Sequence, residues 1–421
     1  MARIKLATFG SFLFAFGLSL CSCANGNGSA SNFSGDVLAN YQNYDSSYSP
    51  DSFQTHQIDS LRGRDDFILG ADISLSSAIT EAGGAYFDKE GVRDPICKIL
   101  KDAGLNTARI RLFHDYASPD GTLCGKLDLS RIISMVREAK QYGLHVLLDF
   151  HYSDSWADPE NQTVPYAWRN DTYQGLLNEV RGYTKSVLEG IQSEGLSVDY
   201  VQIGNEIDNG LLFPFGQIDW DSREEGYDKV AEILSEGTKA TREVFPQSKT
   251  IIHTANALYR WEYGEDWGNK SMEFFEALES RNVDYDIIGA SFYTFVDETP
   301  ISLISDAIDL YGERIGKPVL IMETSYGYTL EWNEYTSNVF HEEWRRDGYP
   351  ISFQGQTNLI LDMVEEVAKA KDHGGLGVCY WGGEWIPNSD SSMRTSWANQ
   401  ALFTYEGVAT PTLYAFGQCR P

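Results

Sequence analysis

Residues 145–154 read HVLLDFHYSD, an apolar run that stops abruptly at acidic, imidazole and hydroxyl side chains. A short apolar run of this kind predicts a β-strand that is buried on both faces. Downstream, residues 173–192 carry apolar side chains at three- and four-residue spacing, which predicts an amphipathic helix. A buried strand followed by such a helix is the repeating unit of a parallel sheet covered by helices.

The same alternation recurs along the chain from about residue 65 onward. The predicted strands are 67–71, 107–113, 145–150, 200–203, 250–253, 287–292, 319–322 and 376–381. The helical patterns between them include 129–142, 173–192, 227–244 and 359–371. Eight alternations predict an α/β fold, a (β/α)8 TIM barrel with enlarged βα loops. An open doubly wound sheet is the alternative, but Gly70-Ala71-Asp72 after the first strand is not a glycine-rich phosphate turn.

The first 23 residues have the pattern of a secretory signal peptide. A basic start precedes an apolar run at 6–20, which is too short to span a bilayer as a mature helix. The following Leu20-Cys21-Ser22-Cys23 resembles a bacterial lipobox, which favours Cys23 as a lipid-modified N-terminus. We therefore expect an exported lipoprotein of the outer membrane or cell surface. Plain secretion is the alternative.

Two further segments complete the expected organisation. Residues 24–64 are rich in Ser, Asn, Tyr, Asp and Gly and poor in aliphatic side chains, which predicts a flexible tether. From residue 65 to residue 421 the sequence pattern stays the same, without an internal repeat or a second linker, so we expect a single catalytic domain there. Its cysteines, Cys97, Cys124, Cys379 and Cys419, allow three disulfide pairings. Cys379 lies in an apolar run and is expected to be a buried free thiol.

The charge balance restricts the partners. The chain has 33 basic and 61 acidic residues, for a formal net charge of -28. Such a surface opposes binding to nucleic acid and to polyanionic polysaccharides, because both need neutralising lysines and arginines. A neutral polysaccharide is compatible with it.

Polar residues gather where the predicted strands end, which is where the active sites of such barrels lie. These positions lie at or just after the ends of the apolar runs, except that Arg109 and Arg111 lie within the second run. They are Asp72, Arg109, Arg111, His114, Asp115, Asp149, His151, Asp154, Asn205, Glu206, His253, Ser291, Tyr293, Glu323, Tyr380 and Trp381. None of the strand ends carries a lysine for Schiff-base chemistry, and strand 1 lacks the paired histidines of a metal-dependent hydrolase.

Glu206 and Glu323 follow strands 4 and 7, on opposite sides of the predicted barrel. Two opposed carboxyl groups suit cleavage of a glycosidic bond, in which one attacks carbon and the other transfers a proton. Retention of configuration would place them about 5 to 5.5 Å apart. The alternative is a structural role, in which each glutamate only pairs with a neighbouring arginine.

The strand-end motifs resemble those of the clan A glycosidases, and in particular glycoside hydrolase family 53, the endo-β-1,4-galactanases. The matching segments cover nearly the whole predicted domain, in order. They are Gly70–Ser74, Arg109–Phe113, Leu147–Pro159, Val201–Gly210, Met322–Tyr326, Tyr380-Trp381 and Ser396–Phe403. The resemblance implies retaining hydrolysis of β-1,4-galactan or type I arabinogalactan, a neutral plant polysaccharide, without a cofactor.

The resemblance also implies roles for individual residues. Glu206 would be the acid/base and Glu323 the nucleophile. Asn205 would bind the sugar 2-hydroxyl, and Arg111, rather than Arg109, is favoured as the arginine that keeps the nucleophile ionised. The remaining members expected to support or line the site are Tyr293, Trp381, His151, Asp154, His253 and Asp72. For His253 a structural role is an equal alternative.

The chain departs from the family after Tyr293, where Thr294-Phe295-Val296-Asp297 replaces the usual proline and Trp-His pair. This difference leaves the strictness for galactan open, and a mannanase, xylanase or β-glucanase of clan A is the alternative. A non-catalytic glycan-binding lipoprotein is an alternative of another class. The loop 324–348 lacks the alternating aspartates that some family members use for calcium, so no metal is expected.

Overall fold

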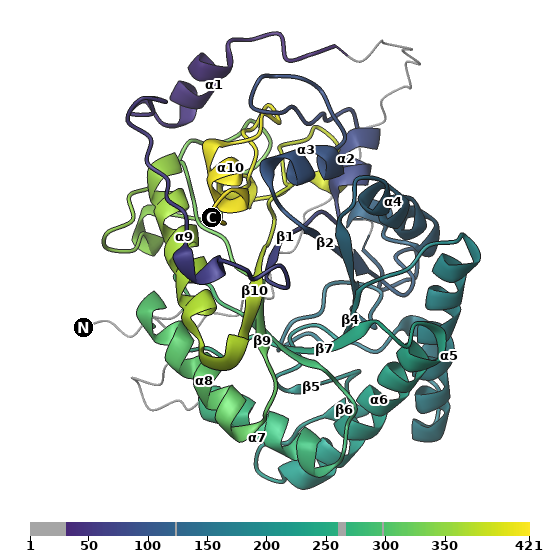
Figure 1. Cartoon of the computed structure of the whole chain (residues 1–421). Helices are drawn as coiled ribbons and strands as arrows, with labels where there is room; N and C mark the ends of the chain where they lie inside the picture. The colour runs from purple at the N-terminus through teal and green to yellow at the C-terminus, as the bar shows by residue number, and fades with distance from the viewer. Residues whose placement is uncertain (1–30, 123, 260–266, 297–298) are drawn as a thin grey trace.

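A computed structural model describes residues 31–122, 124–259, 267–296 and 299–421 of the protein. Parallel strands close into a barrel in the order β1-β10-β9-β8-β7-β4-β3-β2, surrounded by helices (Figure 1). The barrel strands are β1 (Ile68–Asp72), β2 (Thr107–Leu112), β3 (His145–Phe150), β4 (Tyr200–Ile203), β7 (Lys249–Thr254), β8 (Ile287–Ser291), β9 (Val319–Glu323) and β10 (Gly375–Tyr380). The predicted TIM barrel is confirmed, and each predicted strand overlaps an observed one. The short strands β5 (Gly210–Leu211) and β6 (Gly216–Gln217) pair with each other after β4.

The helices bury one face against the barrel, and α4, α5 and α9 begin at side-chain caps. They are α2 (Ser76–Glu81), α3 (Ile96–Ala103), α4 (Leu129–Gln141), α5 (Tyr173–Ser193), α6 (Arg223–Val244), α7 (Trp267–Ser280), α8 (Ile304–Arg314), α9 (Phe353–Lys369) and α10 (Pro411–Gly417). The side chains of Asp128, Thr172 and Ser352 accept backbone N–H groups at the starts of α4, α5 and α9. Each side chain satisfies a donor that has no partner inside its helix.

The barrel interior has an apolar layer with a polar layer directly next to it. The apolar layer consists of Ile68, Leu147, Ile251, Ile287, Leu320, Met322 and Cys379, all buried. Side chains two residues apart on a strand face the same side, so Asp149 and His253 follow Leu147 and Ile251 toward the C-terminal ends. The apolar layer supports the barrel, and the polar layer forms the floor of any site at its mouth.

The cysteines of the domain are all free thiols, with Cys97, Cys379 and Cys419 buried. Cys379 fills the barrel interior so closely that a Cβ on Gly70 would lie 2.7 Å from its Sγ. The predicted buried free thiol at this position is therefore confirmed.

The N-terminal segment differs from the expected tether. From residue 33 it packs on the barrel, and it includes the helix α1 (Val37–Tyr44). Tyr41 is buried and donates a hydrogen bond of 2.5 Å to the carbonyl of Ala409, and Asn40 and Tyr44 both bind the carboxylate of Glu406. The prediction failed because it counted aliphatic residues, whereas this segment is held by aromatic ones.

The expected signal peptide and the proposed anchor at Cys23 lie outside the described residues. Within the ranges that the structure describes, no helix combines the length and apolar character needed to cross a bilayer.

Replacing Tyr41 by alanine should detach the N-terminal segment while leaving the barrel folded. Removal of a buried aromatic side chain costs about 3 kcal/mol, which should raise the rate of proteolysis at residues 31–55 by about a hundredfold. Tyr41→Phe loses only the hydrogen bond to Ala409 and should cost about 1 kcal/mol. Equal cleavage rates in the wild type and in Tyr41→Ala would show that the segment is not held by this contact.

Candidate active site

The two glutamates singled out by the sequence both lie at the C-terminal mouth of the barrel. Glu323 is the last residue of β9, where the register with β8 shifts so that Ser291 pairs with Glu323. Glu206 follows β4 through Gly204, and both residues have left-handed backbone conformations, with φ values of 49° and 81°. A non-glycine residue in this conformation is strained, and such strain is common where a side chain must be aimed at a site.

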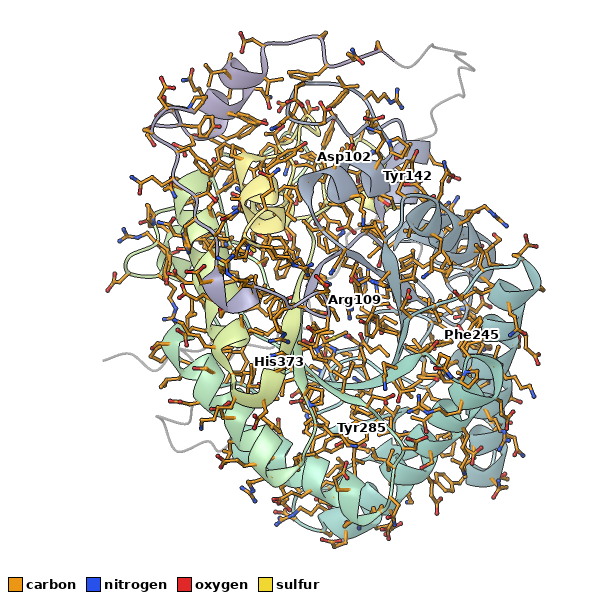
Figure 2. All side chains as sticks on the ribbon, in the orientation of Figure 1. Asp102, Arg109, Tyr142, Phe245, Tyr285 and His373 are labelled. Atoms are coloured by element: carbon orange, nitrogen blue, oxygen red, sulfur yellow. The ribbon has the colours of Figure 1, made fainter. Side chains whose placement is uncertain are left out.

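Arg109 is the central charged group of the barrel interior (Figure 2). It is fully buried, and its guanidinium lies 2.9 Å from Glu323 Oε1, 3.1 Å from Asp72 Oδ2 and 2.8 Å from Asp149 Oδ2. It also donates to Asn205 Oδ1 at 2.9 Å. A buried guanidinium is stable only when its donors are paired, and here acids and amides from several strands surround it.

The arginine that holds Glu323 is thus Arg109, and the preference for Arg111 was wrong. Both side chains point to the same face of β2, but Arg109 is in register with Asp72 and reaches across the interior. Arg111 lies one layer further toward the mouth, 3.6 Å from Asp72, with its guanidinium carbon 4.2 Å from the centre of the Trp156 ring. Spacing along a strand could not distinguish these two depths.

The surroundings of the two glutamates differ. Burial raises the pKa of Glu323, while the charge of Arg109 and a 2.9 Å hydrogen bond from the Tyr293 hydroxyl oppose that rise. Burial and the negative charge of Glu323 raise the pKa of Glu206 well above its usual range, and a hydrogen bond from Ser291 opposes that rise. Glu206 therefore keeps its proton while Glu323 is stabilised as a carboxylate.

Asn205 and His253 form a buried network beside Glu206. His253 Nδ1 lies 3.0 Å from Asn205 Oδ1, and His253 Nε2 lies 3.0 Å from Ser291 Oγ. Burial and then the charge of Arg109 lower the pKa of His253 well below its usual range, so its imidazole is neutral. Because both ring nitrogens contact protein groups, His253 supports Asn205 and Ser291. The structural alternative for this histidine fits the geometry.

Two other residues that the sequence predicts to line the site, His151 and Asp154, contact neighbouring protein groups. His151 Nδ1 accepts the N–H of Ala157, and its Nε2 lies 3.2 Å from Asp149, so the ring braces the layer beneath the site. Asp154 accepts hydrogen bonds from Ser118 and from the backbone of Tyr166, and it lies 3.0 Å from His114. These contacts fix the neighbouring loops, and a further role of Asp154 in lining the site stays a prediction.

Tryptophans surround the mouth of the barrel. The ring of Trp381 lies 4.5 Å from the rings of both Trp385 and Trp397, and 6.4 Å from that of Trp156. Trp381 remains partly exposed, as expected for a residue that stacks against a ligand ring.

Several residues of the site were not assigned a role from the sequence, although they lie within the strand-end motifs. They are Asp149, Gln202, Ser291 and Trp397. Position at the end of a strand was the available signal, but it could not say which neighbour each side chain contacts. No group of three or more His, Cys, Asp or Glu side chains in the described ranges is arranged to hold a metal ion.

One carboxyl group held as an anion and another kept protonated beside it are what hydrolysis of a glycosidic bond requires. Together with the tryptophan surface, they identify the protein as a glycoside hydrolase of the barrel fold. The whole sequence makes this more specific: the chain belongs to glycosyl hydrolase family 53, whose model matches residues 68–416.

Curated and solved relatives agree with this membership. The chain is 33% identical to the endo-beta-1,4-galactanase of Bacillus subtilis, over 83% of this chain and 85% of that one. It is 31% identical to the arabinogalactan endo-beta-1,4-galactanase of Cellvibrio japonicus, over 83% and 90% of the two chains. The solved GH53 catalytic domain of Ignisphaera aggregans superposes with a TM-score of 0.78 at 32% identity, covering 88% of this chain and 100% of that one.

Replacing Tyr293 by phenylalanine should move the acidic limb of the pH profile upward. The lost hydrogen bond lowers the pKa of Glu323, so without it a higher pH is needed to ionise the carboxyl group. A charge-assisted hydrogen bond of about 1.5 kcal/mol corresponds to an upward shift of about one pH unit in the acidic limb of the kcat/KM profile. Tyr183→Phe, which removes a partly buried hydroxyl that donates to the carbonyl of Phe113, is the control. An unmoved acidic limb in Tyr293→Phe would contradict the assignment.

Proposed function

We propose that this protein hydrolyses internal β-1,4-galactosidic bonds of galactan or type I arabinogalactan with retention of configuration. Glu323 is the nucleophile and Glu206 the acid/base. The observation that carries these roles is the asymmetry around the pair, because Arg109 and Tyr293 contact Glu323, whereas Glu206 has no cationic partner among the residues that the structure describes. The choice of galactan rests on the family and on the names of the relatives.

In the first step a carboxylate oxygen of Glu323 attacks the anomeric carbon, and the bond from that carbon to the leaving oxygen breaks. Glu206 gives its proton to the leaving oxygen, which departs as a hydroxyl group. The loss of this proton gives Glu206 a negative charge just as Glu323 loses its own to the new covalent bond. The total charge of the buried pair is therefore unchanged.

In the second step Glu206 takes a proton from water, and the water oxygen attacks the anomeric carbon. The bond to Glu323 breaks, which restores both groups to their starting states. The proposed role of Asn205 in binding the sugar 2-hydroxyl is supported by its contacts. Its Oδ1 is held by Arg109, while its Nδ2 donates to Ala157 and has a second hydrogen. Trp381 supplies the stacking surface beneath the sugar ring.

The substrate is tested by a panel of linear β-1,4-galactan, mannan, xylan and β-glucan. We expect new reducing ends from galactan, and NMR of the first products should show the β-anomer. Preferential cleavage of another glycan would replace the substrate but keep the mechanism. α-Anomeric first products would overturn the roles of the two glutamates.

The roles of the two acids separate in matched variants. Glu323→Gln should lose about 10⁴-fold or more in kcat, because no covalent intermediate forms. Glu206→Gln should lose about 10² to 10⁴-fold, and less on substrates with acidic leaving groups that need no proton. Glu179→Gln on the outer surface of α5 is the control, and equal losses with every leaving group would contradict an acid/base role for Glu206.

We further propose that the protein is exported and anchored by acyl chains at Cys23. The support is the basic start, the apolar run and the lipobox-like Leu20–Cys23. In a bacterial host fed a labelled fatty acid, the wild type should carry label and partition with membranes. Cys23→Ser should lose the label, whereas retention of label with Cys23→Ser and its loss with Cys21→Ser would move the anchor to Cys21.

A further inference from the structure

A third buried carboxyl group lies in the loop after β10, outside the catalytic pair. Glu384 is 1% exposed, and its Oε1 accepts the backbone N–H of Leu75 at 3.1 Å. Its other oxygen, Oε2, has no hydrogen-bond partner among the described residues. Burial of an ionised carboxylate with an unpaired oxygen is costly, so this arrangement favours the neutral acid.

The groups around Glu384 come from three neighbouring segments. The charges of Asp72 on β1 and Arg111 on β2 both act on Glu384, and Cys124 and Tyr86 lie in the loops beyond these strands. Burial and the charge of Asp72 raise the pKa of Glu384 to about 8, although Arg111 opposes the rise. Glu384 therefore carries its proton near neutral pH.

Arg111 connects this acid to the tryptophan surface. Its guanidinium lies over the ring of Trp156, and its Nε and Nη2 have no hydrogen-bond partner among the described residues. Trp156 packs edge-on against Trp381, and the residue after Glu384 is Trp385, which also contacts Trp381. Arg111 thus has free donors on the edge of its guanidinium and an aromatic ring on its face.

We propose that Glu384, as a neutral acid, is a positioning residue for sugar binding, because it leaves Arg111 against Trp156 and so keeps the surface formed by Trp156, Trp381 and Trp385 in place. Ionised Glu384 would attract the free donors of Arg111 and draw the guanidinium away from the indole. Arg109, which holds the nucleophile, is not part of this contact. The inference rests on the proposed glycosidase function and assigns a determinant of KM rather than of kcat.

The test compares the wild type with Glu384→Gln, which copies the shape of the neutral acid but cannot ionise. kcat and KM for β-1,4-galactan are measured from pH 6 to pH 9, with Glu179→Gln as the control. At pH 6 the two enzymes should agree within about twofold. As the pH rises past 8, KM of the wild type should increase relative to Glu384→Gln, by about tenfold at pH 9, while the ratio of kcat values stays constant.

Taking the ratio of the two enzymes removes the titration of Glu206 and Glu323, which both enzymes share. A KM ratio independent of pH would overturn the proposal, and so would a change confined to kcat. Absence of activity in the wild type would instead overturn the proposed substrate, so the two failures are distinguishable.

A second measurement does not depend on activity. An acid whose pKa is raised by folding destabilises the native state as pH rises from its unfolded pKa toward its folded pKa. The thermal midpoint of the wild type should therefore fall relative to that of Glu384→Gln between pH 5 and pH 8. In infrared difference spectra, a protonated carboxyl band present in the wild type and absent in Glu384→Gln should disappear by pH 9. Parallel midpoints and no such band would overturn a neutral Glu384.

Discussion

The contact between Arg109 and its ring of acids is the constraint on which the rest of the site depends. A guanidinium without solvent must be neutralised and hydrogen-bonded, and here Asp72, Asp149 and Glu323 provide the charge. These acids come from strands β1, β3 and β9, so the barrel has to close for the arginine to be satisfied. The same closure carries Glu323 to the mouth, which couples formation of the fold to formation of the nucleophile.

This arrangement also explains the division between the two catalytic acids. Two neighbouring carboxyl groups in equivalent surroundings share one proton, and nothing then decides which of them keeps it. Arg109 contacts one acid directly and leaves the other beside a serine hydroxyl. His253 stays neutral because it is buried near the same arginine, so it adds no competing positive charge beside Glu206.

Sequence reasoning predicted the barrel and the strand ends well, because buried strands and their polar termini follow from local patterns. It named Glu206, Glu323 and Asn205, which stand directly after apolar runs. It could not resolve how deep a side chain lies in the barrel or which groups it contacts. Arg109 and Arg111 are both arginines on the same face of β2, and only the register with β1 shows which of them lies deeper in the barrel. Asp154 follows a strand end, as the site residues do, but its carboxylate oxygens accept hydrogen bonds from the loops around it. The aromatic N-terminal segment was missed because its contacts are with residues far away in the chain.

The register shift at the end of β9 determines which way the side chain of Glu323 points. Regular alternation along β9 would direct Leu320 and Met322 inward and the next side chain outward, toward the helices. The extra residue of the irregularity reverses that parity for one position only. The number of residues in β9 relative to β8 therefore decides whether Glu323 faces the active site. If β9 kept its length but paired with β8 without this irregularity, regular alternation would turn Glu323 toward the helices, and the barrel would no longer present a nucleophile.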